Sequence, residues 1–207
     1  MSIKLANVRL AFADLFTPTD FNNDGKFAYK ATLLLEPGSE NEAKVREAIV
    51  EAAKAQWHDK AKAELSAIEK KDRTCLHDGS DKDYKDFDGL LYVSASNKQR
   101  PTIVDKRGLA IIDESGDTVD RQGKPAGPAK GGVPYSGCYA HASIEIWAQD
   151  NKWGKRINAS LGGIMFHKDG EAFAGGKATS VEEFDEFVEE DSDEPEADDD
   201  DNYADLF

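Results

Sequence analysis

Hydrophobic and polar residues alternate most regularly in CYAHASIEIWAQ, residues 138–149. Such alternation is typical of a strand with one buried face. The polar face also carries Tyr139 and Trp147. Residues 151–154 predict a turn, and KRINASLGGIMF (155–166) is expected to return as the hairpin partner. The apolar face of the first strand comprises Cys138, Ala140, Ala142, Ile144 and Ile146.

Other segments also have strand character. Residues 3–14 alternate, but the apolar parity changes near Ala6 and Asn7, which predicts a β-bulge. Branched and aromatic residues predict strands at 26–36 and 89–97. Two short candidates, TIVD and LAIID, flank Lys106-Arg107-Gly108. The connections rich in Gly, Pro, Asp and Asn are expected to be loops, and they are residues 17–25, 72–89 and 121–137.

A long helix is predicted between the second and third strands. Ser39 and Glu42 form a capping box, and an Ala-, Glu- and Lys-rich sequence predicts a helix that continues to about Lys71. The protein is therefore expected to be mainly β with one substantial α-helix. The strand count favours an OB-type Greek-key β-barrel with extended loops. A β-sandwich is the alternative.

Charge divides the chain into two parts. The sequence has 41 acidic and 26 basic residues, and 15 of the acidic residues but none of the basic ones lie in residues 181–207. Residues 1–180 are therefore neutral overall. A block of like charge cannot bury a core and is typically disordered. We expect one folded domain over 1–180 and a disordered acidic interaction tail over 181–207.

The tail ends in apolar residues, although solubility alone requires only charge. Tyr203, Leu206 and Phe207 follow a run of aspartates. We predict that these three residues bind a partner protein through a hydrophobic pocket ringed by basic side chains. The acidic run is expected to imitate a phosphate backbone and compete for a nucleic-acid groove. A tail that only increases solubility is the alternative.

Little in the sequence points to catalysis or metal binding. The spacings of Cys75 with His77 and of Cys138 with His141 match no common zinc pattern, so Cys138 is expected in the core. DFNNDG (20–25) opens like an EF-hand loop but lacks the bidentate glutamate. Without a phosphate loop or nucleophile motif, we expect no enzyme, no cofactor and no metal.

The sequence also indicates the cellular compartment of the protein. Two cysteines form no disulfide framework, which fits a reducing cytoplasm. The chain has no predicted secretory signal, and its apolar runs are too short to span a membrane.

Basic and aromatic residues point instead to nucleic acid. Tyr139 and Trp147 lie on a strand face where the core does not explain an aromatic ring. Such rings stack on bases, and basic loops contact phosphates. The alternative is ordinary solvated lysines, with Trp147 covered by the helix. The predicted DNA-binding residues are Tyr139, Trp147, Trp153, Lys98, Arg100, Lys106, Arg107, Arg121, Lys124, Lys130, Lys152, Lys155 and Arg156.

These features together resemble the bacteriophage single-stranded DNA-binding proteins. The resemblance is carried by AFADLFTP, LHDGSDKDY, VPYSGCYAHASIEIWA and ASLGGIMF, and by an acidic tail that ends in an aromatic residue. It implies sequence-independent binding of single-stranded DNA during phage replication or recombination, in the cytoplasm of the infected bacterial host. It also implies that the tail recruits phage or host replication proteins such as polymerase or helicase/primase.

The resemblance assigns no individual DNA contacts. A homodimer is possible, and no membrane partner is expected. The alternative function is an acidic-tailed interaction module or a chaperone for basic proteins, without DNA binding of its own.

Overall fold

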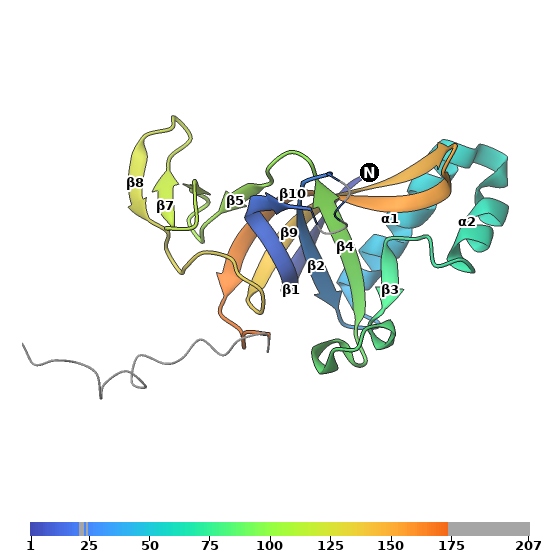
Figure 1. The fold of residues 1–207 in the computed structure, drawn as a ribbon, viewed down its shortest axis with the longest axis horizontal. Helices are drawn as coiled ribbons and strands as arrows, with labels where there is room; N and C mark the ends of the chain where they lie inside the picture. The colour runs from blue at the N-terminus through green and yellow to red at the C-terminus, as the bar shows by residue number, and fades with distance from the viewer. Residues whose placement is uncertain (21–22, 24, 174–207) are drawn as a thin grey trace, which may run out of the picture. The chain divides into compact units, whose positions relative to one another are not determined.

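The computed structural model describes residues 1–20, 23 and 25–173, and the expected tail and the domain boundary at residue 180 lie outside these residues. Within them, ten strands form one sheet with two α-helices packed beside it (Figure 1). In chain order the elements are β1 (Ser2–Thr19), β2 (Ala28–Leu35), α1 (Glu40–Trp57), α2 (Ala61–Glu69), β3 (Leu76–Asp78), β4 (Leu91–Asn97), β5 (Thr102–Val104), β6 (Ala110–Ile111), β7 (Asp117–Val119), β8 (Pro125–Pro128), β9 (Tyr139–Asn151) and β10 (Gly154–Lys168). None of the helices described is long and apolar enough to cross a membrane.

Five of the strands close into a barrel. β1 pairs antiparallel with β2 and with β9, β2 pairs antiparallel with β4, and β9 pairs antiparallel with β10. The ring is completed where β10 runs parallel to β4, with Ala159 opposite Ala95. This is the Greek-key barrel of the OB type that the strand pattern predicts. The prediction of a mainly β fold is confirmed.

The barrel interior is filled by the apolar parity of each strand. Ile144, Ile146 and Cys138 are fully buried, as the alternation in β9 predicts. Their neighbours in the core come from other strands, with Leu5 and Leu10 on β1 among them. At about 25 cal/mol per Å² of apolar surface, this contiguous core is the main source of the barrel's stability.

Three register shifts interrupt β1, the last of them between Asp14 and Thr19 in the pairing with β2. The first lies between Leu5 and Val8, where the pairing with β9 shifts register and Asn7 has a φ of 52°. It confirms the predicted bulge at Ala6 and Asn7. The second was not predicted: the pairing with β2 shifts between Ala11 and Asp14. A bulge turns the side chains that follow it toward the other face of the sheet.

The helix begins as predicted but ends earlier. The Ser39 hydroxyl accepts a hydrogen bond from the Glu42 amide, and the Glu42 carboxylate accepts one from the Gly38 amide. The prediction of one helix to Lys71 is wrong, because α1 ends at Trp57 and His58 adopts a φ of 49°. A short 3-10 turn, His58–Lys60, then leads into α2. The buried Trp57 indole donates to Asp150 on the β9–β10 hairpin, so the helical segment bends where it meets the hairpin.

Two of the expected loops contain regular structure. Residues 72–89 include β3 and two 3-10 turns, Gly79–Asp81 and Lys85–Phe87. Residues 121–137 include β8, which pairs with β7. We call residues 102–130 the wing, because β5 to β8 extend from the barrel as a small antiparallel unit (Figure 1).

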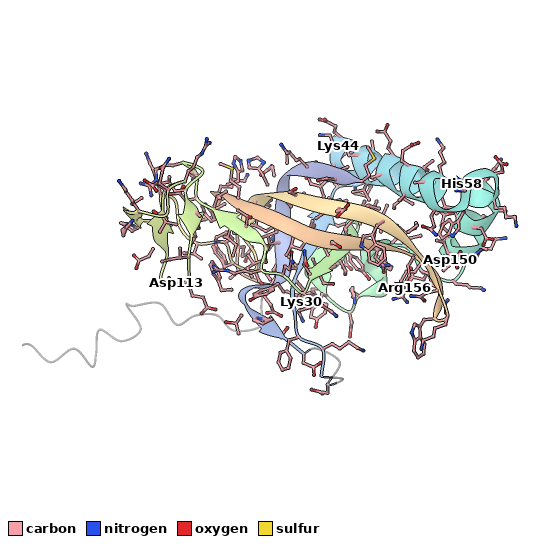
Figure 2. All side chains as sticks on the ribbon, turned by 90° about the horizontal axis from the view of Figure 1, so that it is seen from above. Lys30, Lys44, His58, Asp113, Asp150 and Arg156 are labelled. Carbon is pink, nitrogen blue, oxygen red and sulfur yellow. The ribbon has the colours of Figure 1, made fainter. Side chains whose placement is uncertain are left out.

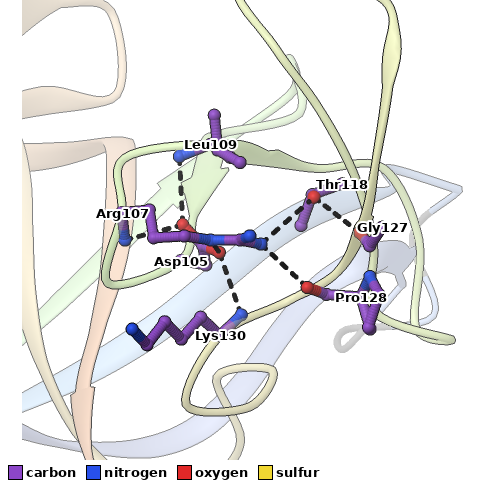
Figure 3. Close-up of polar contacts among 7 residues, drawn as sticks. All are labelled: Asp105, Arg107, Leu109, Thr118, Gly127, Pro128 and Lys130. Carbon is purple, nitrogen blue, oxygen red and sulfur yellow. Dashed lines mark hydrogen bonds and ion pairs between the residues drawn. The ribbon is translucent and has the colours of Figure 1, made fainter.

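A buried carboxylate holds the wing together (Figure 3). Asp105 is fully buried and accepts hydrogen bonds from the backbone amides of Arg107, Leu109 and Lys130. It also forms an ion pair with the Arg107 guanidinium at 2.8 Å. Burial alone would raise the pKa of Asp105, but these hydrogen bonds outweigh it and lower the pKa to about 2. Asp105 therefore remains ionised and ties the two ends of the wing.

Candidate nucleic-acid interface

The outer face of β2 and β4 is a groove with a polar floor. Strand parity places Ala31, Leu33, Val93 and Ala95 in the core, so the alternate residues face outward. Three adjoining cavities of about 490, 690 and 200 Å³ lie over this face, and Ser96 lines all of them. The outward residues of the floor are Lys30, Thr32, Ser94 and Ser96 on β2 and β4, continued by Asn158 and Ser160 on β10.

An aromatic pair forms one wall of the first cavity. The rings of Phe12 and Tyr84 meet edge to face with centroids 5.3 Å apart, and the two residues are 43% and 51% exposed. We call this pair the aromatic wall. Phe12 sits in the second bulge of β1 with a φ of 49°, in the left-handed region that bulky residues rarely adopt. That conformation costs about 1–3 kcal/mol and tends to occur where function requires it. The bulge directs the ring outward instead of into the core.

Basic side chains surround the polar floor. Lys26, Lys30 and Lys82 line the first cavity, Lys98 the second and Arg156 the third. Lys30 is balanced by Asp14 at 3.2 Å, and Lys82 lies over the Tyr92 ring at 5.4 Å. Among the described residues that line the three cavities, the one acid is Asp72, whose carboxylate contacts His77 at 2.7 Å. Basic side chains therefore outnumber acidic ones among the described residues that line the groove, although residues 1–180 are neutral overall.

Trp147, predicted from strand parity, borders this groove. It is 40% exposed, and its indole donates a hydrogen bond at 2.9 Å to Ser160, which lines the second cavity. Figure 2 shows Arg156 and Lys30 on the side of the barrel away from Lys44 and His58 of the helical layer. Because Trp147 is 40% exposed and donates to Ser160 at the groove, it is not covered by α1. Glu145, opposite Ser160 on β9, adds an exposed acid at the same edge.

The tip of the β9–β10 hairpin carries a second exposed ring. Trp153 is 77% exposed, and the Lys152 ammonium lies 5.1 Å from its ring. Lys155 is engaged differently, because it forms ion pairs with Glu64 at 2.6 Å and Asp150 at 3.7 Å. The hydrogen bond with Glu64 raises the pKa of Lys155, so its charge is held and balanced by acids of the helical side.

Other predicted residues lie away from the groove. Tyr139 starts β9, eight residues and therefore about 27 Å along the strand from Trp147. It lies under the Lys168 ammonium at 4.5 Å and lines a separate cavity of about 240 Å³. The two rings do not form one stacking platform.

The remaining basic residues belong to the wing or its approach. Arg107 is occupied by Asp105, and Lys106 lies over the Phe166 ring at 5.3 Å. Arg100 lies over the Phe16 ring at 5.2 Å and donates to the Ile111 carbonyl. Arg121, Lys124 and Lys130 are exposed. The structure therefore separates the predicted residues into a groove and hairpin group, the wing, and Tyr139.

Sequence reasoning missed the aromatic wall and the lysines beside it. Phe12 was assigned to a regular strand, and Tyr84 to a polar loop. One signal was available in the latter case: Tyr84 and Phe87 are aromatic residues in an otherwise polar segment that also carries Lys82 and Lys85. For Lys30 the available signal was strand parity, because Lys30 and Thr32 alternate with Ala31 and Leu33.

The thiols and the metal candidates have structural surroundings. Burial raises the pKa of Cys75 to about 12 and raises that of Cys138. No group of three or more His, Cys, Asp or Glu residues in the described part of the chain could hold a metal ion. In the turn at 20–25, the Gly25 amide donates to Asp20, while Asn22 and Asp24 lie outside the described residues. Tyr203, Leu206 and Phe207 also lie outside them.

Comparisons with known proteins agree with this architecture. The family model described as Enterobacter phage Enc34, ssDNA-binding protein, matches residues 1–199. Protein p50 of Acyrthosiphon pisum secondary endosymbiont phage 1 is 40% identical over 190 residues, which cover 90% of this chain and 94% of that protein.

Solved structures of phage proteins are also similar, and two of them show the likeness of fold. The single-stranded DNA-binding protein from bacteriophage Enc34, in complex with ssDNA, gives a TM-score of 0.56 at 23% identity and covers 84% of this chain and 89% of that chain. The gp2.5 single-stranded DNA-binding protein of bacteriophage T7 gives a TM-score of 0.50 at 14% identity, with 92% and 96% covered. At sequence identities of 23% and 14%, these comparisons show similarity of fold alone.

Proposed function

We propose that this chain binds single-stranded DNA without sequence specificity, because it belongs to the family of the phage Enc34 ssDNA-binding protein and presents a groove suited to that ligand. The observation that carries the proposal is the aromatic wall, Phe12 and Tyr84, standing beside Lys30 and Lys82 over a hydroxyl-lined floor. Rings supply stacking surfaces for bases, and lysines neutralise phosphates.

The chemistry of the groove accounts for the lack of sequence specificity. Every base offers a ring face to Tyr84, whatever its hydrogen-bonding edge. Lys26, Lys82 and Lys98 carry point charges that would contact a phosphate backbone rather than read a base. The small hydroxyls of Ser94 and Ser96 leave room for a strand to lie against the sheet.

The groove also defines a path for the strand. It leads from the aromatic wall over β4 to Ser160 and Arg156 on β10, since the three cavities adjoin. Trp147 lies at its border, and Lys152 and Trp153 extend it at the hairpin tip. A duplex does not present its bases to such rings, so the groove should prefer unpaired strands.

The test is a titration of labelled oligonucleotides followed by fluorescence anisotropy. A single strand of deoxythymidine, a single strand of mixed sequence and the matching duplex are compared at equal nucleotide concentration and at two salt concentrations. We expect both single strands to bind similarly, the duplex to bind more weakly, and affinity to fall with salt. Equal binding of the duplex would contradict the proposal.

We further propose that residues 181–207 regulate the groove. Their 15 carboxylates are attracted to the same lysines and arginine as DNA phosphates. Deletion of residues 182–207 should therefore raise the affinity for single-stranded DNA at low salt, and the gain should fade as salt screens both interactions. Unchanged affinity at low salt would show that the tail does not compete.

The end of the tail has a separate proposed role in replication or recombination in the host cytoplasm. Phe207 is the anchor by which a partner such as a polymerase or helicase is recruited. Phe207→Ala keeps every side-chain charge, so it should leave DNA affinity nearly unchanged while weakening capture of the partner in a pull-down. If Phe207→Ala alters DNA affinity as much as the deletion does, the Phe207 ring binds the folded domain of the same chain, and its role as a partner anchor is contradicted.

A further inference from the structure

The aromatic wall stands on a loop that is folded against the outside of the barrel. Residues 79–90 close on themselves, because the Gly79 amide donates to the Leu90 carbonyl at 2.8 Å. Inside this loop the Phe87 amide donates to the Tyr84 carbonyl at 2.9 Å. The Phe87 side chain is fully buried over Ala11 and Leu34, on the outer faces of β1 and β2. Phe87 is therefore the point at which the loop that carries Tyr84 is anchored.

Phe87 is also the base on which both rings of the wall rest. Its ring centroid lies 5.9 Å from that of Phe12 and 5.9 Å from that of Tyr84. Movement of Phe87 would remove a ring contact from both Phe12 and Tyr84, and no other described ring contacts both of them. The residues that fix the position of Phe87 therefore affect the position of both rings of the aromatic wall.

The segment that follows β10 packs against this anchor. The Phe173 ring lies 6.2 Å from that of Phe87. The segment is itself fixed, because the Tyr135 hydroxyl donates to the Gly170 carbonyl at 3.0 Å. A β-carbon at Gly170 would collide with the Gly137 carbonyl, so the close approach requires glycine. Residues 169–173 thus form a buttress behind the loop.

Arg9 joins the buttress to the loop. Its guanidinium lies 4.2 Å from the centre of the Phe173 ring and donates to the Glu171 carbonyl at 2.8 Å. The same group forms an ion pair with Asp86, next to Phe87, at 3.3 Å. One planar guanidinium thereby contacts both segments, which a lysine ammonium could not do with the same geometry.

We infer that Phe173 and Arg9 are positioning residues that hold the aromatic wall in its DNA-binding geometry through Phe87. The inference rests on the proposed function, and it assigns a role in DNA binding to two residues that do not line the groove. Neither contacts DNA in this arrangement. Their effect on affinity passes through Tyr84 and Phe12.

The test uses Phe173→Ala and Phe173→Tyr in the full-length protein, each alone and Phe173→Ala also combined with Tyr84→Ala. Affinity for labelled oligodeoxythymidine is measured by anisotropy, and melting temperature is recorded for every variant. We expect Phe173→Ala to weaken binding by about two- to tenfold, the effect of losing one aromatic contact. Phe173→Tyr keeps the ring and should keep the affinity. In the Tyr84→Ala background, Phe173→Ala should add little, because coupled residues are not additive.

Phe16→Ala is the matched control. Arg100 lies over the Phe16 ring much as Arg9 lies over that of Phe173, but Phe16 lines a different cavity with Val133 and Tyr135. Phe16→Ala should lower the melting temperature and leave affinity unchanged. A Phe173→Ala effect that is fully additive with Tyr84→Ala, or that is matched by Phe16→Ala, overturns the inference.

A measurement without DNA separates this inference from the proposed function. If Phe173 supports Phe87, Phe173→Ala should accelerate hydrogen exchange at the Phe87 amide, which reports opening of the loop. Unchanged exchange there overturns the inference even if single-stranded DNA binds. Failure of the wild-type protein to bind single-stranded DNA would instead remove the proposed function, and the exchange result would still decide whether the buttress exists.

Discussion

Replacing Tyr84 by alanine removes the outer ring of the aromatic wall. Tyr84 is half exposed and touches Phe12 and Phe87 at ring distances of 5.3 and 5.9 Å. Stacking of one base on an aromatic ring contributes about 1–3 kcal/mol. Tyr84→Ala should therefore raise the dissociation constant for single-stranded DNA by about 5- to 150-fold.

The variant should still fold. Each of the two ring pairs that Tyr84 forms contributes about 0.5–1.5 kcal/mol, and a domain of this size loses about 2–4 °C of melting temperature per kcal/mol. The variant should thus melt about 2–12 °C below the wild type. The slope of affinity against salt should stay the same, because no charge is removed.

Two variants make the assay decisive. Tyr84→Phe keeps the ring and should keep the affinity. Tyr139→Ala removes an aromatic residue that lies under Lys168, away from the groove, and should leave affinity unchanged. Anisotropy titrations of all three variants across a salt series give both the affinity and the slope. If Tyr139→Ala weakens binding and Tyr84→Ala does not, the groove has been assigned to the wrong face of the barrel.

Three further predictions follow from charges and rings elsewhere in the fold. Lys82→Gln should flatten the line of log affinity against log salt by about 0.7, the loss of one phosphate contact, whereas an equal change from Lys124→Gln in the wing would contradict the proposed path. Trp147→Ala should weaken binding by about 1–3 kcal/mol in the same titration, with near wild-type melting; early melting would instead make Trp147 a structural residue. The folded pKa of Asp105, about 2, lies below its unfolded value, so its stabilisation of about 2–3 kcal/mol is present above about pH 4 and is lost as pH falls toward 2. Denaturant unfolding of Asp105→Asn should show that loss at neutral pH, and a fully stable variant would contradict this reading of the wing.

The barrel could be predicted because its strands obey local rules. In β9 the strict alternation identifies both the buried Ile144 and the outward Trp147. The Ser39 cap and the first bulge are likewise encoded by a few adjacent residues. Such features are determined by residues that are close in the sequence. They persist in the folded structure because the packing of the core favours the same local conformations.

The aromatic wall could not be predicted because it depends on contacts between distant segments. Phe12 faces outward only because the backbone at that residue takes a left-handed conformation, which nothing adjacent in the sequence requires. Tyr84 is placed by Phe87 and by the ion pair of Asp86 with Arg9. The break after α1 likewise lies where the Trp57 indole contacts Asp150, which is 93 positions away in the sequence.

The closure of the barrel also constrains when the protein can function during its own synthesis. β1 emerges first from the ribosome, but one of its two partners is β9, with Ser2 opposite Glu145. The seam at Ala95 and Ala159 forms later still, since it needs β10. Until then the edge of β1 that pairs with β9 and the part of β4 around Ala95 are unpaired and open to association with other chains. A nascent chain that has reached only α2 therefore has neither a closed barrel nor a complete groove, and slow translation before β10 would lengthen the period in which it can aggregate.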